Sequence, residues 1–343
     1  MRLRFAVPLS LIASLALLSG CGSSGSVSGS AGGVDSRIQL ERAAIAGVLA
    51  QTPEVIDDLE FESTLFTDTD LTAGEALSSR HSLRWWRTFS HVERTVEYAF
   101  ADTDSTGQPQ NAIVTIHKHF SGTFHVQNGN GPRKPGRDHD AALASTNGDD
   151  DDQGEDGDDD GHHPGGPSDS TKKYFEKALE DNWTRRVSLH RVYRQDDTVG
   201  HWKVVATSGV VVNSEGHTIE IQSLRIVSST LDTTLTAPLD LWKLRRLLVF
   251  SPRENVELTA TTNGDSSDVV SLLSRGPRSI FRNEGGGVFT ARWRTSNHTG
   301  VGHIGVNALT HETLFDAQGP YDSAAWILPY VVRGNECGDY LPR

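Results

Sequence analysis

The chain has 343 residues, of which 45 are acidic and 32 basic, so its formal net charge is −13. Such a chain repels polyanions, which argues against nucleic acid as a partner. Hydrophobic residues make up 36% of the sequence, enough for real cores, and two cysteines are too few for a disulfide framework.

The N-terminal residues have the pattern of an export signal. Arg2 and Arg4 precede an apolar run over residues 5–18, and no acidic residue interrupts it. The length of the run is typical of a signal-peptide core and is too short for a membrane span.

Leu18, Ser19, Gly20 and Cys21 end this run, and their order resembles the lipobox of bacterial lipoproteins. The resemblance implies that residues 1–20 are a signal peptide and that Cys21 is lipidated and binds the membrane through its acyl chains. It also implies a place in the cell envelope, and in a Gram-negative host the outer membrane, because Gly22 stands where inner-membrane lipoproteins usually carry Asp. An ordinary cleaved signal peptide is the alternative.

Lipidation of Cys21 leaves Cys337 as the remaining thiol. Near the C-terminus it is either a spare thiol in a loose tail, residues 334–343, or a partner for an intermolecular disulfide.

Residues 21–36 are rich in Gly and Ser and predict a flexible tether. Ser36 with Gln39 has the form of a capping box, an apolar pattern follows, and Pro53 ends it. A helix is therefore expected over residues 37–50.

The apolar period then changes to two. Residues 92–100 and 112–120 alternate between apolar and polar side chains, and the turn-like residues 102–110 separate them, so they predict a β-hairpin. Further strands are expected at about 184–193, 202–206, 209–212 and 217–227.

The segment from about 128 to 170 has almost no large apolar residue, and nine of the twelve residues 149–160 are acidic. Such a segment cannot bury enough surface to order itself and predicts a disordered loop inside one α+β domain, residues 37–250. The helix followed by long strands resembles the nuclear-transport-factor-like cone fold, which implies a ligand-binding or catalytic pocket. Residues 240–250 fit a short helix or a crossing strand.

Residues 251–333 contain several short alternating runs separated by turn signals, which predicts a β-sandwich. The order Gly287, Phe289, Trp293 followed by Gly302, Ile304 and Val306 resembles the late strands of bacterial immunoglobulin-like domains. The predicted fold class is thus α+β and mainly β: a helix and antiparallel sheet with an acidic insert, then an immunoglobulin-like β-sandwich.

Two groups of residues have spacings that suit a metal. Asp156, Asp158 and Asp160 match the first half of a calcium loop, but Pro167 stands where a bidentate Glu belongs, and a solvated acidic loop is the simpler interpretation. His117 and His119 point to one face of a strand, as two ligands of zinc or copper would, but the apolar residues lie on the opposite face and favour exposed histidines. No metal and no cofactor is therefore expected.

Signatures of common enzymes are missing: the mature chain has no Gly-x-Ser-x-Gly elbow, no phosphate loop and no Cys-x-x-Cys pair. Trp85 and Trp86, between Arg84 and Arg87, fit either a patch for sugars or partners or core packing. Two functions remain possible. The first is a non-enzymatic, lipid-anchored protein for binding, adhesion or scaffolding, with envelope proteins or glycans as candidate partners. The second is a cone with a ligand-binding or catalytic pocket.

Overall fold

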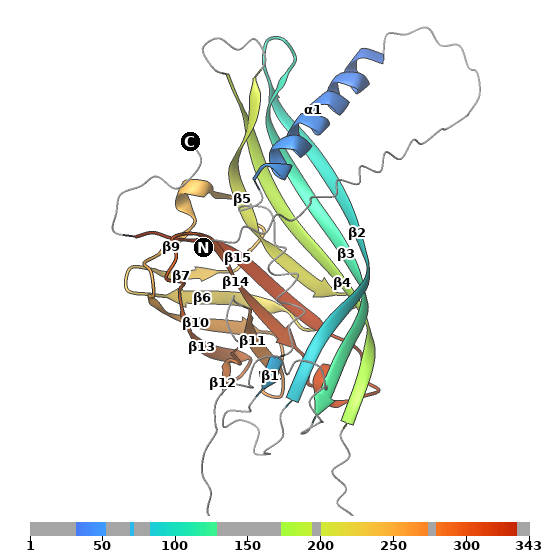
Figure 1. The fold of residues 1–343 in the computed structure, drawn as a ribbon, viewed down its shortest axis with the longest axis vertical. Helices are drawn as coiled ribbons and strands as arrows, with labels where there is room; N and C mark the ends of the chain where they lie inside the picture. The colour runs from blue at the N-terminus through green and yellow to red at the C-terminus, as the bar shows by residue number, and fades with distance from the viewer. Residues whose placement is uncertain are drawn as a thin grey trace, which may run out of the picture. The chain divides into compact units, whose positions relative to one another are not determined.

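The computed structural model describes residues 32–52, 69–71, 83–128, 173–193, 200–273 and 279–334. The fold is mainly β, as predicted, with two sheets and few helices (Figure 1). Among the described residues, none of the helices is both long and apolar enough to span a membrane.

Helix α1, Gly32–Ala50, confirms the predicted helix but begins five residues earlier. The described chain divides inside it, and Arg42 is the first residue of the larger compact unit. In that unit Ile45 and Leu49 lie one helical turn apart and are 0% and 6% exposed. The helix therefore packs through one apolar stripe, and it ends as Gln51 donates to the Val48 carbonyl before Pro53.

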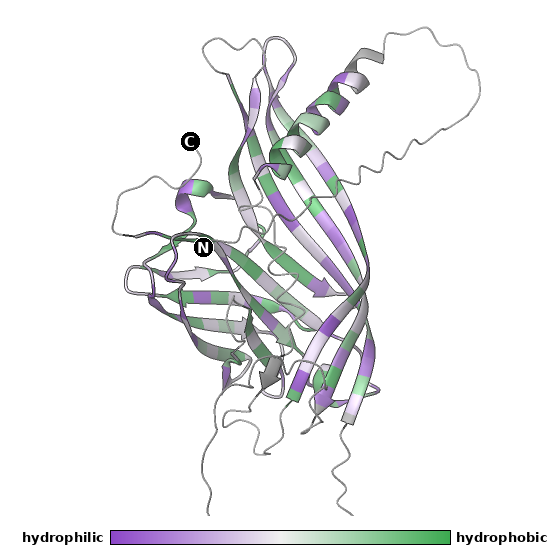
Figure 2. Ribbon diagram, viewed as in Figure 1, coloured by the Kyte–Doolittle hydropathy of each residue, from purple (hydrophilic) through white to green (hydrophobic). Residues whose placement is uncertain are grey.

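Three long antiparallel strands form one half of the larger sheet. They are β2, Leu83–Thr103, β3, Pro109–Asn128, and β4, Lys173–Val192. The pair β2–β3 is the predicted hairpin, with Val96 opposite Ile116. Figure 2 shows hydrophobic and hydrophilic residues alternating along these strands, so the sheet has one apolar inner face and one polar outer face.

The larger sheet has ten strands in the order β1-β2-β3-β4-β5-β15-β14-β11, with β8 added to β5 and β9 to β15. Among the described strands, β9 alone pairs in parallel. The remaining strands of this sheet are β1, Thr69–Leu71, β5, His201–Ser214, β8, Trp242–Lys243, β9, Leu248–Phe250, β11, Val269–Leu273, β14, Gly300–Leu309, and β15, Ser323–Val332.

The smaller sheet has five strands in the order β12-β13-β10-β6-β7, so β7 is an edge strand. Its strands are β6, Ile221–Val227, β7, Asp232–Leu235, β10, Asn255–Thr262, β12, Arg282–Gly285, and β13, Val288–Arg294. Two short helical turns complete the fold: η1, Leu244–Arg246, and α4, His311–Phe315. The predicted single helix or strand over 240–250 is thus divided into β8, η1 and β9.

Every residue of β15 is buried, without the alternation of a half-exposed strand. The reason is that each face of β15 packs on a different core. Ala325 and Ile327 belong to the first core, with α1 and the inner face of β2–β5. Ala324 and Leu328 belong to the second core, with β6, β10 and β13.

Both sheets combine strands from the two sides of residue 250, where the sequence predicts a domain boundary. In the larger sheet Val211 of β5 pairs with Trp326 of β15, and in the smaller one Leu224 of β6 pairs with Ala260 of β10. Local alternation predicts strands but carries no information on such distant pairing, so the boundary does not appear in the sheets. The immunoglobulin-like resemblance of residues 251–333 stays a prediction.

Candidate functional site

The two histidines singled out as metal candidates lie on the polar outer face of β3. His119 contacts its β4 neighbours, with Nε2 2.8 Å from Glu180 Oε2 and Nδ1 3.0 Å from Asn182 Oδ1. Nδ1 of His117 lies 3.1 Å from Thr184 Oγ1. The hydrogen bond with Asn182, and then the charge of Glu180, raise the pKa of His119. Within the described part of the chain, no group of three or more His, Cys, Asp or Glu side chains is placed to hold a metal.

Other predicted sites fall on residues that the structure does not describe. They are the lipidation site Cys21, the calcium candidates Asp156, Asp158 and Asp160, and the second cysteine, Cys337. The predicted acidic loop lies outside the described residues too, apart from Asn128 at the end of β3. By contrast, Asp104 lies in the β2–β3 turn, where its carboxylate accepts hydrogen bonds from Thr106 and Gln108.

The tryptophan pair divides between the two faces of β2. Trp85 is fully buried in the first core, as the packing interpretation predicts. Trp86 lies on the outer face, where its ring stacks on His125 at 4.8 Å with an interplanar angle of 9°. The ring of Trp86 is thus engaged in a stack across neighbouring strands.

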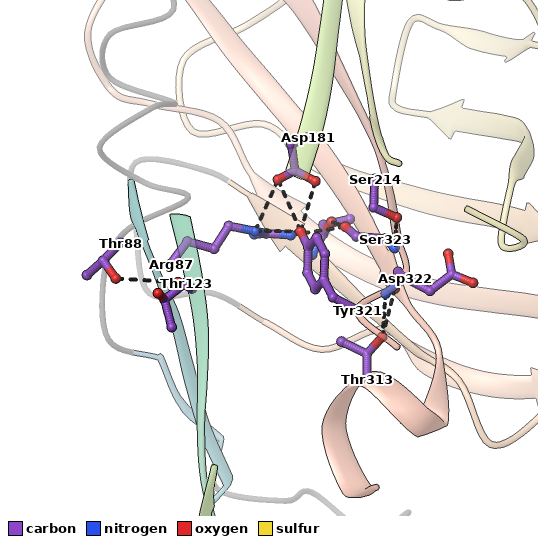
Figure 3. Close-up of polar contacts among 10 residues, drawn as sticks. Arg87, Thr88, Thr123, Asp181, Ser214, Thr313, Tyr321, Asp322 and Ser323 are labelled. Atoms are coloured by element: carbon purple, nitrogen blue, oxygen red, sulfur yellow. Dashed lines mark hydrogen bonds and ion pairs between the residues drawn. The ribbon is translucent and has the colours of Figure 1, made fainter. Parts of the chain in front are cut away.

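A buried polar network joins the inner faces of β2 and β4 to β15 and the residues just before it (Figure 3). Arg87 Nε donates to the Tyr321 hydroxyl at 2.9 Å, and Arg87 Nη2 donates to Ser323 Oγ at 3.0 Å. The Tyr321 hydroxyl donates to the Asp181 carboxylate at 3.1 Å, and Arg87 Nε lies 3.6 Å from Asp181 Oδ2. Tyr321 therefore bridges the buried charges.

The charges of this network are shielded from water: Arg87 and Asp181 are each 2% exposed. Burial raises the pKa of the Asp181 carboxyl, while the charge of Arg87 opposes the rise. Burial also raises the pKa of the Tyr321 phenol. Because side chains of the protein itself fill this region, an external substrate has no access, and the network is a structural element that ties distant strands together.

Three further cations are buried on the inner face of β4: Lys177, Arg185 and Arg191. Lys177 donates to the carbonyl oxygens of Glu312, Gly319 and Pro320 and so holds α4 and the segment that follows it. Burial lowers the pKa of Lys177. These contacts account for Lys177 as a fold-holding residue.

A groove lies between β7, η1 and β9, with a cavity volume of about 480 Å³. Its lining is mostly apolar, and five of the apolar side chains are partly exposed. The residues that line it are Thr230, Leu231, Thr233, Leu235, Trp242, Arg246, Leu247, Leu248 and Val249. Pockets that bind small ligands are of this size and composition.

The groove arises because two sheet edges meet there. β7 is the last strand of the smaller sheet, and β9 is a three-residue addition to β15. Neither edge is covered by a further described strand, so the apolar side chains Leu231, Leu235 and Leu248 stay partly open while they pack on the second core.

Positive charge gathers at one side of the groove. Lys243, Arg245 and Arg246 are exposed within four consecutive residues, and Arg246 lines the cavity. No acidic residue lines it, and Asp232 of the adjoining β7 is paired with Arg225 at 2.8 Å. The groove therefore combines an apolar surface with a cation, in a chain that is acidic overall.

Sequence reasoning missed this groove. The order Trp-Lys-Leu-Arg-Arg-Leu-Leu-Val over residues 242–249 interleaves cations with apolar residues and was the available signal. Its interpretation as one helix or one strand concealed that the segment consists of three short elements, β8, η1 and β9, and borders a groove.

No protein-family model, no curated protein and no solved structure matches this chain.

Proposed function

We propose that this chain is a lipid-anchored cell-envelope protein that acts as a non-enzymatic binding module and takes its ligand in the groove between β7, η1 and β9. The observation that carries the proposal is the lining of the groove: six of its nine residues are apolar, the cavity measures about 480 Å³, and several lining side chains are partly open to solvent. Contiguous exposed apolar surface of this kind is typical of binding sites.

The lining also favours binding over catalysis. It contains two threonines and one arginine but no histidine, cysteine, carboxylate or lysine. General acid–base catalysis needs a group that titrates near the working pH, and nucleophilic catalysis needs an activated nucleophile. The groove offers hydrogen bonds, one positive charge and apolar contact, which are the means of a binding site.

The buried network supports the same distinction. Arg87, Asp181 and Tyr321 are residue types that many active sites use, but here each is buried and engaged with the others. The inner face of β2–β5, where a cone fold would have its pocket, carries packed side chains of the first core. The groove is therefore the better candidate for a ligand site.

Photolabelling tests the binding site. A neutral dodecanol that carries a diazirine is added to the full chain in phosphatidylcholine vesicles, and mass spectrometry locates the labels. We expect saturable labelling within residues 230–249. Thr233→Trp places a ring in the groove and should abolish it, whereas Thr234→Trp, at an exposed neighbour that does not line the groove, should not. Labelling that is unsaturable, or equal in the two variants, would contradict the proposal.

The anchor and the location are tested separately. The lipobox at Cys21 supports lipidation, and Gly22 supports the outer membrane of a Gram-negative host. Cells are grown with labelled palmitate, and the wild type is compared with Cys21→Ser. The wild type should carry the label and fractionate with membranes, and the variant should lose both. Labelled, membrane-bound Cys21→Ser protein would refute the anchor.

A further inference from the structure

We infer that the ligand of the groove between β7, η1 and β9 is a single-chain anionic amphiphile of the ionised fatty-acid type. The inference rests on the proposed function, because it names the ligand class of the same site. The acyl chain occupies the apolar lining, and the carboxylate binds Arg246.

The apolar part of the groove calls for an apolar ligand body. Leu231, just before β7, and Leu235 of β7 line the cavity together with Leu247, Leu248 and Val249, and Trp242 completes the apolar lining. A hydrocarbon chain matches a lining of branched aliphatic side chains, because burying each CH₂ group contributes about 0.8 kcal/mol and demands no hydrogen-bond partner.

The polar part calls for a single anionic group. Arg246 is the one charged residue that lines the cavity, and no hydrogen bond or ion pair within the described residues engages it. A guanidinium presents a planar fork of donors that matches a carboxylate in a bidentate geometry. The hydroxyls of Thr230 and Thr233 supply further hydrogen-bonding groups beside the apolar wall.

Charge complementarity selects among amphiphiles. Lys243 and Arg245 add positive charge next to Arg246, and no carboxylate lines the groove. An alkylammonium would meet three cations and no counter-charge, and a neutral alcohol would leave the guanidinium of Arg246 unused. The anionic head group is therefore favoured over both.

The experiment compares two photoreactive probes on the full chain in phosphatidylcholine vesicles at alkaline pH: a diazirine dodecanoic acid and the matched diazirine dodecanol. In the wild type we expect the acid to saturate labelling of residues 230–249 at about a tenfold lower concentration than the alcohol, the size typical of one charge-assisted hydrogen-bonded contact. Arg246→Gln should remove this tenfold advantage, so that the acid and the alcohol saturate labelling at similar concentrations.

Arg245→Gln is the matched control, since Arg245 is exposed, adjacent and outside the lining. It should keep most of the advantage of the acid. Equal saturation by acid and alcohol in the wild type would overturn the inference, and so would equal losses in the two arginine variants, which would indicate diffuse attraction of a membrane surface.

The two proposals fail differently. Saturable alcohol labelling that Thr233→Trp blocks, without a preference for the acid, leaves the binding module standing and removes the anionic ligand. Absence of saturable labelling by either probe, or saturable labelling outside residues 230–249, removes both.

Discussion

Removal of one partner of the buried Arg87–Asp181 pair is expected to destabilise the fold strongly, whereas removal of both is expected to cost much less. The variants are Asp181→Leu, Arg87→Met and the double variant. Asp181→Leu leaves the guanidinium of Arg87, 2% exposed, with no carboxylate and with the neutral oxygens of Tyr321 and Ser323 as its hydrogen-bond acceptors. Arg87→Met leaves the Asp181 carboxylate with the Tyr321 hydroxyl as its donor.

The distance between the Arg87 and Asp181 charges sets the size of the expected loss of stability. At the observed separation of 3.6 Å, an effective dielectric constant of about 20 gives an attraction of about 4.6 kcal/mol. Loss of one member of a buried pair generally costs about 3–5 kcal/mol, while replacement of both by apolar residues is often neutral. We therefore expect about 3–5 kcal/mol for Asp181→Leu and a smaller loss for the double variant.

The two single variants should respond differently to pH. Burial already raises the pKa of Asp181, and loss of Arg87 removes a charge that opposes the rise. A carboxyl whose folded pKa exceeds its unfolded value loses stability as the pH rises through the interval between the two. Arg87→Met should therefore be less destabilising near the ordinary pKa of 3.8 than at pH 8. The free energy of unfolding of Asp181→Leu should itself lack this titration, because the variant has no carboxyl at this position and arginine does not release its proton.

Urea denaturation of the full chain, followed by tryptophan fluorescence and circular dichroism at both pH values, measures these free energies of unfolding. The four proteins form a double-mutant cycle, and its coupling energy isolates the pair. Additive losses in the double variant would refute the reasoning. So would a pH-independent cost of Arg87→Met, since the buried carboxylate would then not be the source of the loss.

Three further predictions concern single positions. Hydrogen bonds from Thr106 and Gln108 lower the pKa of Asp104 from 3.8 to about 2, so its contribution to stability is present above the ordinary pKa and is lost as the pH falls toward 2. Carbon NMR titration should find this lowered pKa, and Asp104→Asn should reduce the acid sensitivity of the protein in this interval. An ordinary pKa for Asp104 would contradict the prediction. Gly122→Ala would place a Cβ 2.0 Å from the Thr88 carbonyl oxygen, and in urea denaturation it should lower the free energy of unfolding by at least about 1–3 kcal/mol. Gly47 is exposed in α1 and no atom would lie within 4 Å of an added Cβ, so Gly47→Ala should raise the free energy of unfolding by about 0.5–1 kcal/mol. Losses of equal size in the two variants would contradict this prediction. Leu49→Ala should lower the free energy of unfolding by about 2–5 kcal/mol, and a loss no larger than that of Leu40→Ala, at a residue 71% exposed, would show that α1 does not pack through this stripe.

The sequence predicts the helix and the first hairpin because both depend on local periodicity. It places the start of the hairpin at residue 92 instead of 83, and the register explains why. A β-bulge between Phe89 and His91 shifts the alternation by one residue. Inward side chains are odd-numbered before it, as Trp85 and Arg87 are, and even-numbered after it, as Val96 is. The pattern therefore breaks in sequence although the strand continues.

The buried network was beyond such reasoning for a different reason. Arg87 and Tyr321 are 234 residues apart, and a charged residue at an inward position looks like a surface residue until its partner is known. The groove likewise depends on β7 and β9 becoming edges of two sheets, which no local pattern reports. Element types were predictable, whereas their pairing and the site that it creates were not.

Among the described residues, most buried charged side chains are cations, although the net charge of the chain is negative. Four described cations are buried on the inner faces of β2 and β4: Arg87, Lys177, Arg185 and Arg191. The buried carboxylates of the described residues are Asp181 on β4 and Asp322 just before β15.

Aromatic rings lie close to three of these buried cations. Arg191 lies 4.8 Å from the ring centre of Trp202, Arg185 lies 5.9 Å from that of Trp183, and Lys177 lies 5.5 Å from that of Phe175. A cation over a ring face gains about 0.5–2 kcal/mol, more where water is excluded. Such contacts help an acidic chain keep these cations in its interior, which a charge count along the sequence does not reveal.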